Sequence, residues 1–85
     1  MPTQPSRHDP RRIESWERRR QAVGGAIRRL RKERGMTQEQ LADRSGVDRT
    51  VLIDVELGRQ GLLYERLFDI AEALDLSVVD LFADA

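Results

Sequence analysis

The sequence predicts an all-α fold, and three observations support this prediction. Apolar residues recur at steps of three and four residues along most of the chain, as on one face of an α-helix. Residues that cap helices stand at the boundaries between these stretches. No stretch of useful length alternates apolar and polar residues, as a half-buried strand would. We therefore expect five domain helices, preceded by an N-terminal helical extension.

The first predicted helix follows Asp9, which can cap it, and has Pro10 at its first position. Residues 1–9 contain two prolines and no apolar periodicity, so we expect a disordered tail there. An apolar stripe follows, with an arginine as its one polar member: Ile13, Trp16, Arg20, Val23, Ile27 and Leu30. Gly24 and Gly25 interrupt it, at a cost of about 1 kcal/mol per glycine relative to alanine. We therefore expect a helical extension over residues 10–22, then a domain over residues 23–85 whose first helix covers residues 23–34.

Capping signals divide the rest of the domain into short helices. Thr37 with Gln40, and Ser77 with Asp80, each have the spacing of a capping box. Asp48 can cap a helix between them. A fourth helix, after the turn GRQG, carries a further apolar face made of Leu67, Ile70, Ala71 and Leu74.

The pair Ser45–Gly46 turns the chain between the second and third helices. Gly46 can adopt a positive φ without steric cost, and Val47 can enter the core behind it. Ala42 is small enough for the two helices to approach closely. On these residues alone, a helix-turn-helix and an ordinary helical hairpin explain the pattern equally well.

The composition excludes several classes of protein. Eighty-five residues form one small domain, and no cysteine is present to form a disulfide or a thiolate metal site. No Ser/His/Asp or Cys/His set and no glycine-rich phosphate loop can be assembled, so we expect no enzyme, catalytic residue, metal or cofactor. No apolar run is long enough to span a membrane and no secretory signal is present, so we expect a cytoplasmic protein.

The formal net charge is zero, but the charges are unevenly distributed. Residues 1–34 contain 11 Lys/Arg against 4 Asp/Glu, a net charge of +7, and residues 35–85 contain 4 against 11, a net charge of −7. Proteins bind phosphate with a local face, so the balance does not exclude a nucleic-acid partner. The alternative is that the two halves attract one another across the fold.

Residues 23–82 resemble the lambda-repressor-like (Xre/Cro) family of helix-turn-helix DNA-binding domains. The stretch VGGAIRRLRKERGMTQEQLADRSGV is similar to the first two helices and turn of that family. VELG, which contains Glu56 and Gly58, resembles the end of its third helix, and LFDIAEALDLSVVDLF its fourth helix and the start of its fifth. The resemblance implies a five-helix domain, a nucleoid-associated homodimer bound to double-stranded DNA, and a transcription regulator that represses by occluding a promoter.

The resemblance also implies which residues contact DNA: Thr37, Gln38, Arg49, Thr50, Ile53 and Arg59. The first two would lie against a phosphate at the start of the second helix. A recognition helix over about residues 48–56 would enter the major groove. There, paired hydrogen bonds from Arg49 to guanine would contribute about 1–3 kcal/mol of discrimination. Further candidate phosphate contacts, for which a solvated helix face is the alternative explanation, are Arg28, Arg31, Lys32 and Arg44.

Two residues of the predicted recognition helix depart from the family pattern. Ile53 replaces a residue that is usually small and polar, although it can pack on thymine methyl groups. Asp54 is not explained by DNA binding, and pairing with a nearby arginine, such as Arg49 or Arg44, is its better explanation.

Apolar residues after the recognition helix also depart from the family pattern. Leu57, Leu62 and Leu63 exceed what the core of a monomer needs, whereas Tyr64 is expected in the core. Together with Ile53, the three leucines predict a surface that a second subunit or another protein covers. The alternative function is therefore a protein-interaction module on a helix-turn-helix fold.

Overall fold

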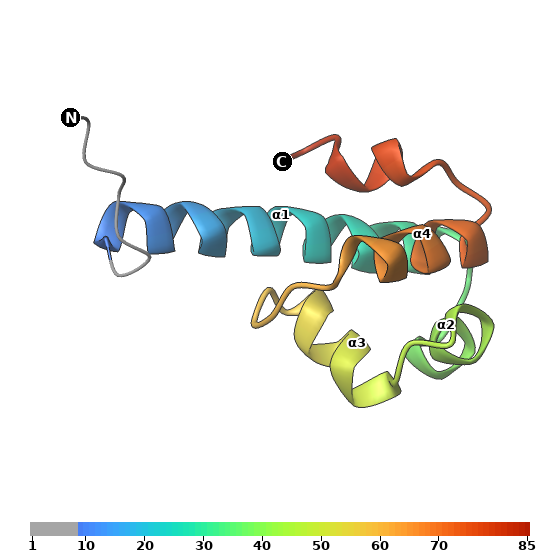
Figure 1. Ribbon diagram of the computed structural model, residues 1–85. Helices are drawn as coiled ribbons and strands as arrows, with labels where there is room; N and C mark the ends of the chain where they lie inside the picture. Colours follow the sequence, from blue (N-terminus) through green and yellow to red (C-terminus); the bar gives the residue numbers. More distant parts are fainter. Residues whose placement is uncertain (1–8) are drawn as a thin grey trace.

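The computed structural model describes residues 9–85, in which four α-helices and one 3-10 helix follow one another without a strand (Figure 1). The elements are α1 (Pro10–Glu33), α2 (Gln38–Ser45), α3 (Arg49–Glu56), α4 (Tyr64–Ala73) and η1 (Val78–Phe82). The prediction of an all-α fold is confirmed. The tail expected over residues 1–9 lies outside the described residues except for Asp9.

One long helix replaces the two that the sequence predicts on either side of Gly24. The cap is as expected, because the Asp9 side chain accepts a hydrogen bond from the Arg11 N–H at 2.9 Å. From Pro10, however, α1 runs without a break to Glu33, so the predicted interruption is wrong. Gly24 is buried against α3, and a Cβ added to it would lie 1.9 Å from the carbonyl oxygen of Val55. The glycine therefore permits the close approach of two helices and does not end one.

The short helices α2 and α3 begin at the predicted capping residues. Thr37 Oγ1 accepts a hydrogen bond from the Gln40 N–H at 3.0 Å, and Gln40 Oε1 accepts one from the Thr37 N–H at 2.9 Å. Asp48 Oδ1 accepts hydrogen bonds from the N–H groups of Thr50, at 2.8 Å, and Val51, at 3.3 Å. These bonds satisfy N–H groups that the first turn of a helix leaves unpaired.

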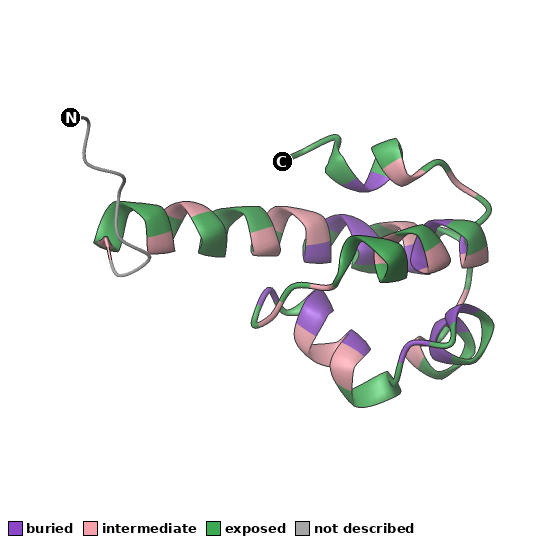
Figure 2. Ribbon diagram, in the orientation of Figure 1, coloured by how far each residue is buried: buried purple, intermediate pink, exposed green. Residues whose placement is uncertain are grey.

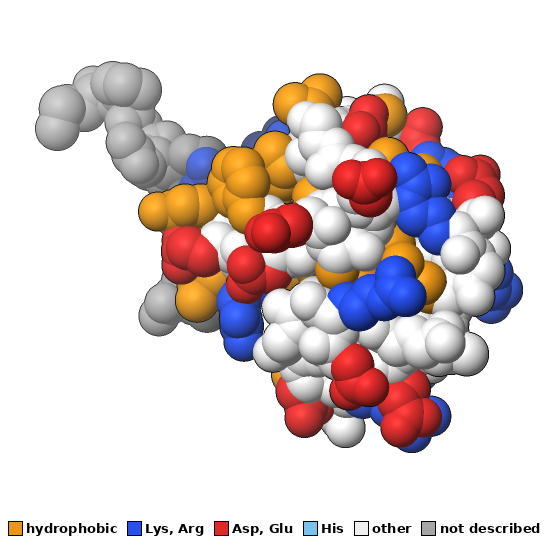
Figure 3. Space-filling view, turned by 90° about the vertical axis from the view of Figure 1, so that its right-hand side faces the viewer, with side chains coloured by type: hydrophobic (Ala, Val, Ile, Leu, Met, Phe, Trp, Pro, Cys, Tyr) orange, Lys and Arg blue, Asp and Glu red, His pale blue; other side chains and the backbone are white. Residues whose placement is uncertain are grey.

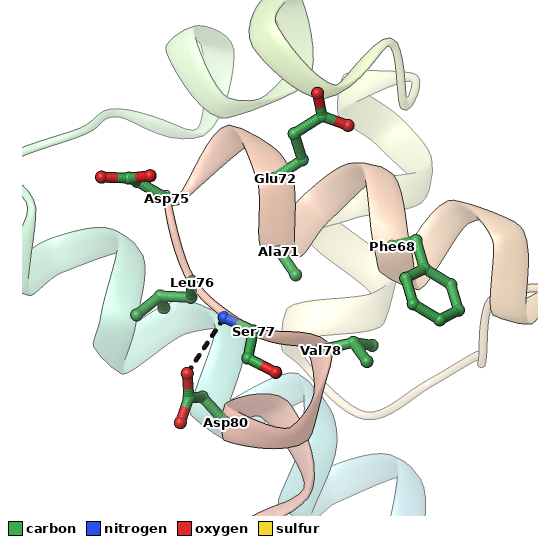
Figure 4. A pocket seen from close by; sticks show the side chains of 8 residues that line it. All are labelled: Phe68, Ala71, Glu72, Asp75, Leu76, Ser77, Val78 and Asp80. Carbon is green, nitrogen blue, oxygen red and sulfur yellow. Dashed lines mark hydrogen bonds between the residues drawn. The ribbon is translucent and has the colours of Figure 1, made fainter.

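The last element is a 3-10 helix and not the fifth α-helix that the sequence predicts. Its predicted capping box is present: the Ser77 N–H donates to Asp80 Oδ2 at 3.1 Å (Figure 4). Ser77 Oγ accepts a hydrogen bond from the Val79 N–H at 3.3 Å. The element has only five residues, of which Leu81 alone is buried. The 3-10 helix is a form that proteins use in short pieces, often as a connector or beside the end of an α-helix.

The core lies where the C-terminal half of α1 meets the other four elements (Figure 2). Each element or its C-cap contributes to the set of fully buried large side chains, which are Ile27, Leu41, Leu52, Ile70, Leu74 and Leu81. None of residues 10–22 is buried, and this half of α1 extends past the core (Figure 1). Among the described residues, no helix is long and apolar enough to cross a membrane.

Candidate nucleic-acid interface

The turn between α2 and α3 is tight and anchored in the core. Gly46 has a φ of 74°, a left-handed conformation that favours glycine, and its N–H donates to the Ala42 carbonyl at 2.9 Å. The next residue, Val47, is buried, and its N–H donates to Ser45 Oγ at 3.2 Å. Gly46 and Val47 thus do what the sequence predicts, and the turn holds the start of α3 against the core.

The outer face of α3 presents two of the predicted base-reading residues to solvent. Leu52 and Val55 are buried, so the opposite side of this helix faces outward. Arg49 and Thr50 are exposed, and Ile53 is half-buried. Within residues 9–85, the Arg49 side chain has no hydrogen-bond or ion-pair partner, so its guanidinium is available to a ligand.

A buried ion pair holds the C-terminal end of α3 against α1. Arg31 and Glu56 are 7% and 5% exposed, and two hydrogen bonds join them, Nε to Oε2 at 2.7 Å and Nη2 to Oε1 at 2.9 Å. Arg31 Nη1 also donates to the Met36 carbonyl at 2.9 Å, and Gln38 Nε2 donates to Glu56 Oε1 at 3.1 Å. These bonds connect α1, α2 and α3. Arg31 is therefore a structural residue, and the prediction that it contacts phosphate is wrong.

The sequence analysis missed this pair, although both residues stand at core positions of their helices. Arg31 follows the fully buried Ile27 by four residues, and Glu56 follows the fully buried Leu52 by four residues. Residues four apart lie on the same face of a helix. Opposite charges at the core positions of two different helices were the signal that could have revealed the pair.

The remaining candidate phosphate contacts differ in how free their side chains are. Thr37 Oγ1 already accepts the capping hydrogen bond, and the half-buried Gln38 already donates to Glu56. Arg28 and Arg44 are exposed and have no ion pair among the described residues. Contact of any of these residues with DNA stays a prediction.

Asp54 pairs with an arginine, as predicted, although the arginine is Arg59 and not one of those named from the sequence. Asp54 Oδ1 lies 3.7 Å from Arg59 Nη1, and the two side chains are 37% and 70% exposed. A pair so accessible to solvent contributes about 0–1 kcal/mol. Arg59 can therefore exchange Asp54 for a phosphate at little cost.

Acidic residues share a surface hollow with Arg49 between α2 and α3. Glu39, Asp43 and Asp48 line a shallow hollow there together with Arg49. Acidic and basic side chains are also interspersed on the face of the molecule that Figure 3 shows. A DNA backbone that approached Arg49 would therefore also meet the carboxylates of this hollow.

Apolar side chains remain exposed on the α3–α4 loop and on α4. Leu57 and Leu63 are 52% and 71% exposed, whereas Leu62 is half-buried against the core. Tyr64 is 71% exposed, so its predicted place in the core is wrong. Tyr64 is the first residue of α4, and the residue that packs against the core is Leu62, two positions earlier in the loop. Three more exposed apolar residues, which the sequence analysis missed, are Phe68, Val79 and Phe82.

A comparison with known families identifies the domain. The family model described as helix-turn-helix matches residues 27–81 of the chain. The chain belongs to the helix-turn-helix family. The predicted family resemblance is thereby confirmed, and the tight turn at Gly46 is the turn of this helix-turn-helix domain.

Two proteins of known sequence are similar to this helix-turn-helix protein. The uncharacterized HTH-type transcriptional regulator y4dJ of Sinorhizobium fredii is 40% identical over 62 residues, which cover 73% of this chain and 80% of that protein. The competence pilus inhibition repressor of Acinetobacter baylyi is 40% identical over 60 residues, which cover 71% of this chain and 54% of the repressor. The family is one of transcriptional regulators and not of enzymes.

Two crystal structures share the fold of this helix-turn-helix protein. The restriction-modification controller protein C.AhdI from Aeromonas hydrophila has a TM-score of 0.72 at 35% identity, covering 74% of this chain and 96% of that one. The clp gene regulator ClgR from Corynebacterium glutamicum has a TM-score of 0.73 at 35% identity, covering 76% of this chain and 69% of that one. Both are named as regulators or controllers, as the sequence analysis expects for this fold.

Proposed function

We propose that this helix-turn-helix protein is a sequence-specific DNA-binding transcription regulator that represses as a homodimer. The observation that carries the proposal is the pair Arg49 and Thr50, which face solvent on a short helix anchored by Leu52, Val55 and Glu56. Two such helices in a dimer would enter successive major grooves about 34 Å apart. The likeness to a named repressor supports repression as the mode of action. Such a protein would act in the cytoplasm, in association with the nucleoid.

Each exposed residue of the interface has a proposed role. Arg49 would form paired hydrogen bonds with a guanine, Thr50 would bind a base or a phosphate, and Ile53 would pack on a thymine methyl group. Arg59 would bind the DNA backbone after leaving Asp54. The other proposed backbone contacts are Thr37, Gln38, Arg28 and Arg44.

The Arg49→Ala variant tests sequence reading. Duplexes are first selected by the wild-type protein from a random pool, and we expect enrichment of a motif with two-fold symmetry. Loss of the guanine contact should then weaken binding to the selected duplex by about 5- to 150-fold, which corresponds to about 1–3 kcal/mol. Binding to an unrelated duplex should change much less. Fluorescence anisotropy with labelled duplexes measures both affinities.

Arg18→Ala is the matched control for Arg49→Ala, because Arg18 is exposed on the half of α1 that extends past the core. It removes the same positive charge, so its effect on the selected duplex should be small and independent of sequence. If Arg49→Ala keeps the wild-type affinity and preference, α3 is not the reading helix. If no motif is enriched, the proposed function fails.

The second candidate function, a module that binds another protein, is favoured by the carboxylates that share a hollow with Arg49 and by the exposed Leu57 and Leu63. Salt distinguishes the two functions. The affinity of a DNA reader falls steeply as salt rises, because each contacted phosphate releases counterions. Duplex affinity that is weak at every salt concentration and does not depend on sequence would favour the protein module.

Self-association is tested at Leu63, the most exposed leucine of the predicted partner surface. A charge placed there would be buried without a partner in the dimer, so Leu63→Glu should raise the dissociation constant of the dimer at least about ten-fold. Gly25→Glu adds the same side chain where nothing lies within 4 Å and should leave self-association unchanged. Sedimentation equilibrium of the two variants makes the comparison. Equal dimerisation of wild type and Leu63→Glu would exclude this loop as the interface.

A further inference from the structure

The N-terminal half of α1 carries an apolar face that its own domain does not bury. Ile13 and Trp16 continue the stripe by which α1 contacts the core, but none of residues 10–22 is buried. Figure 1 shows this half of the helix projecting past the other elements. Trp16 is exposed, and the guanidinium carbon of Arg12 lies over its ring, 5.8 Å from the ring centroid. An amphipathic helix that projects with an exposed aromatic side chain indicates a surface for a partner.

Two arginines flank Trp16 on its own side of α1. Arg12 stands four residues before it and Arg19 three residues after it, and side chains at these spacings share a helix face. Both arginines are exposed. Residues 10–22 contain five arginines against two glutamates, a net charge of +3. This face of α1 is therefore an aromatic ring between two positive charges.

The outer face of α4 carries the opposite pattern. Phe68 is exposed, with Glu65 three residues before it and Glu72 four residues after it. Both glutamates are exposed and have no ion pair among the described residues. Phe68 also borders a hollow of about 590 Å³ between α4 and η1, and within residues 9–85 no arginine or lysine lines it (Figure 4). Residues 64–85 contain one arginine against six acidic residues, a net charge of −5. This face of α4 is therefore an aromatic ring between two negative charges.

The two patterns match when the helices lie antiparallel. Each residue advances an α-helix by about 1.5 Å, so the charges stand about 6 Å and about 4.5 Å from the aromatic residue on both helices. In an antiparallel pair with the two rings opposed, each arginine is level with a glutamate. The contacts would be Trp16 with Phe68, Arg12 with Glu72 and Arg19 with Glu65. Aromatic pairs and pairs of opposite charge both favour such a contact.

A second copy of the chain is the partner that these two faces fit. α1 is one unbroken helix, and Figure 1 places its N-terminal half beyond the end of α4, so this half cannot turn back onto α4 of its own chain. We propose that the N-terminal half of α1 lies antiparallel on α4 of a second copy, with Trp16 against Phe68. A two-fold axis would form this contact twice in one dimer. Leu63 directly precedes α4, so the contact adjoins the partner surface proposed above. It rests on the proposed homodimer but does not require DNA.

Trp16 is the only tryptophan in the chain, so its fluorescence tests the contact directly. As the full chain is concentrated from monomer to dimer, the emission maximum should move to shorter wavelength, because Phe68 of the second copy excludes water from the indole. Phe68→Ala should remove this shift and raise the dissociation constant of the dimer at least about ten-fold in sedimentation equilibrium. At a concentration where both proteins are monomeric, Phe68→Ala should keep the wild-type melting temperature, because Phe68 is exposed.

Two variants with reversed charges test the pairing of the helices. Arg12→Glu/Arg19→Glu places like charges across the contact. Glu65→Arg/Glu72→Arg does the same from the other side. Each variant alone should self-associate at least about ten-fold more weakly than the wild type. An equimolar mixture restores opposite charges in both contacts of a two-fold dimer, so it should associate within about three-fold of the wild-type affinity. Loss of folding in either variant could not produce this rescue.

Arg11→Glu/Arg18→Glu is the matched control, because it changes the net charge equally on the side of α1 that faces away from Trp16. Its self-association should equal that of the wild type. An equal loss in this control, no rescue in the mixture, or a wild-type dimer with unchanged Trp16 emission would overturn the contact and leave the proposed homodimer standing. A wild-type chain that stays monomeric would overturn both. None of these measurements contains DNA, so DNA binding is judged separately.

Discussion

Replacing Gly24 with alanine is expected to lower the free energy of unfolding by about 3 kcal/mol. The added Cβ would lie 1.9 Å from the carbonyl oxygen of Val55 and 3.0 Å from its carbonyl carbon. Both are backbone atoms, so no side-chain rotation relieves the overlap, and α1 and α3 must move apart. Urea denaturation followed by circular dichroism measures the change.

Gly25→Ala is the matched control, one residue further along the same helix. Gly25 is exposed, and an added Cβ would meet nothing within 4 Å. Alanine should therefore stabilise the protein by about 1 kcal/mol, the difference in helix propensity between the two residues. Opposite signs for the two variants are the expected result. If Gly24→Ala were also stabilising, the close contact between α1 and α3 could not be present in solution.

These two glycines show which parts of the fold the sequence could predict. Asp9, Thr37, Asp48 and Ser77 were identified as caps because a capping hydrogen bond joins residues two or three positions apart. The role of Gly24 depends on Val55, which is far along the chain, so the local pattern suggested a break in the helix. The length of η1 could not be predicted either, because a capping box marks where a helix begins and does not determine how many turns follow.

The same limit applies to the candidate site. The family resemblance implied that Arg49 and Thr50 face outward, and their exposure agrees with the burial of Leu52 and Val55 on the opposite side of α3. In contrast, Arg31 stands in a run of basic residues, and only the packing of α1 on α3 brings it to Glu56. The tertiary structure was therefore needed to decide which of several arginines is free to bind DNA.

The buried pair of Arg31 and Glu56 leads to the second large expected effect. Glu56→Leu should lower the free energy of unfolding by about 3–5 kcal/mol, because the guanidinium would remain buried without its carboxylate. Gln38 would lose its acceptor as well. The control is Asp84→Leu. Asp84 forms an ion pair with Arg29 at 2.9 Å, and both side chains are about half exposed, 49% for Arg29 and 57% for Asp84. Removing that pair should cost no more than about 1 kcal/mol. Thermal and urea denaturation provide both values.

The double variant Arg31→Met/Glu56→Leu distinguishes destabilisation by an unpaired buried charge from destabilisation by altered packing. When both charges are replaced by apolar side chains of similar volume, no buried charge remains, so the double variant should be more stable than Glu56→Leu alone. The hydrogen bond from Arg31 to the Met36 carbonyl is lost in the double variant, so recovery should be incomplete. The two single variants, Arg31→Met and Glu56→Leu, are measured as well. If the double variant loses as much free energy of unfolding as the two single variants lose together, the charges do not interact. The junction of α1, α2 and α3 would then depend on packing alone, and the ion pair would not be what holds α3 in place.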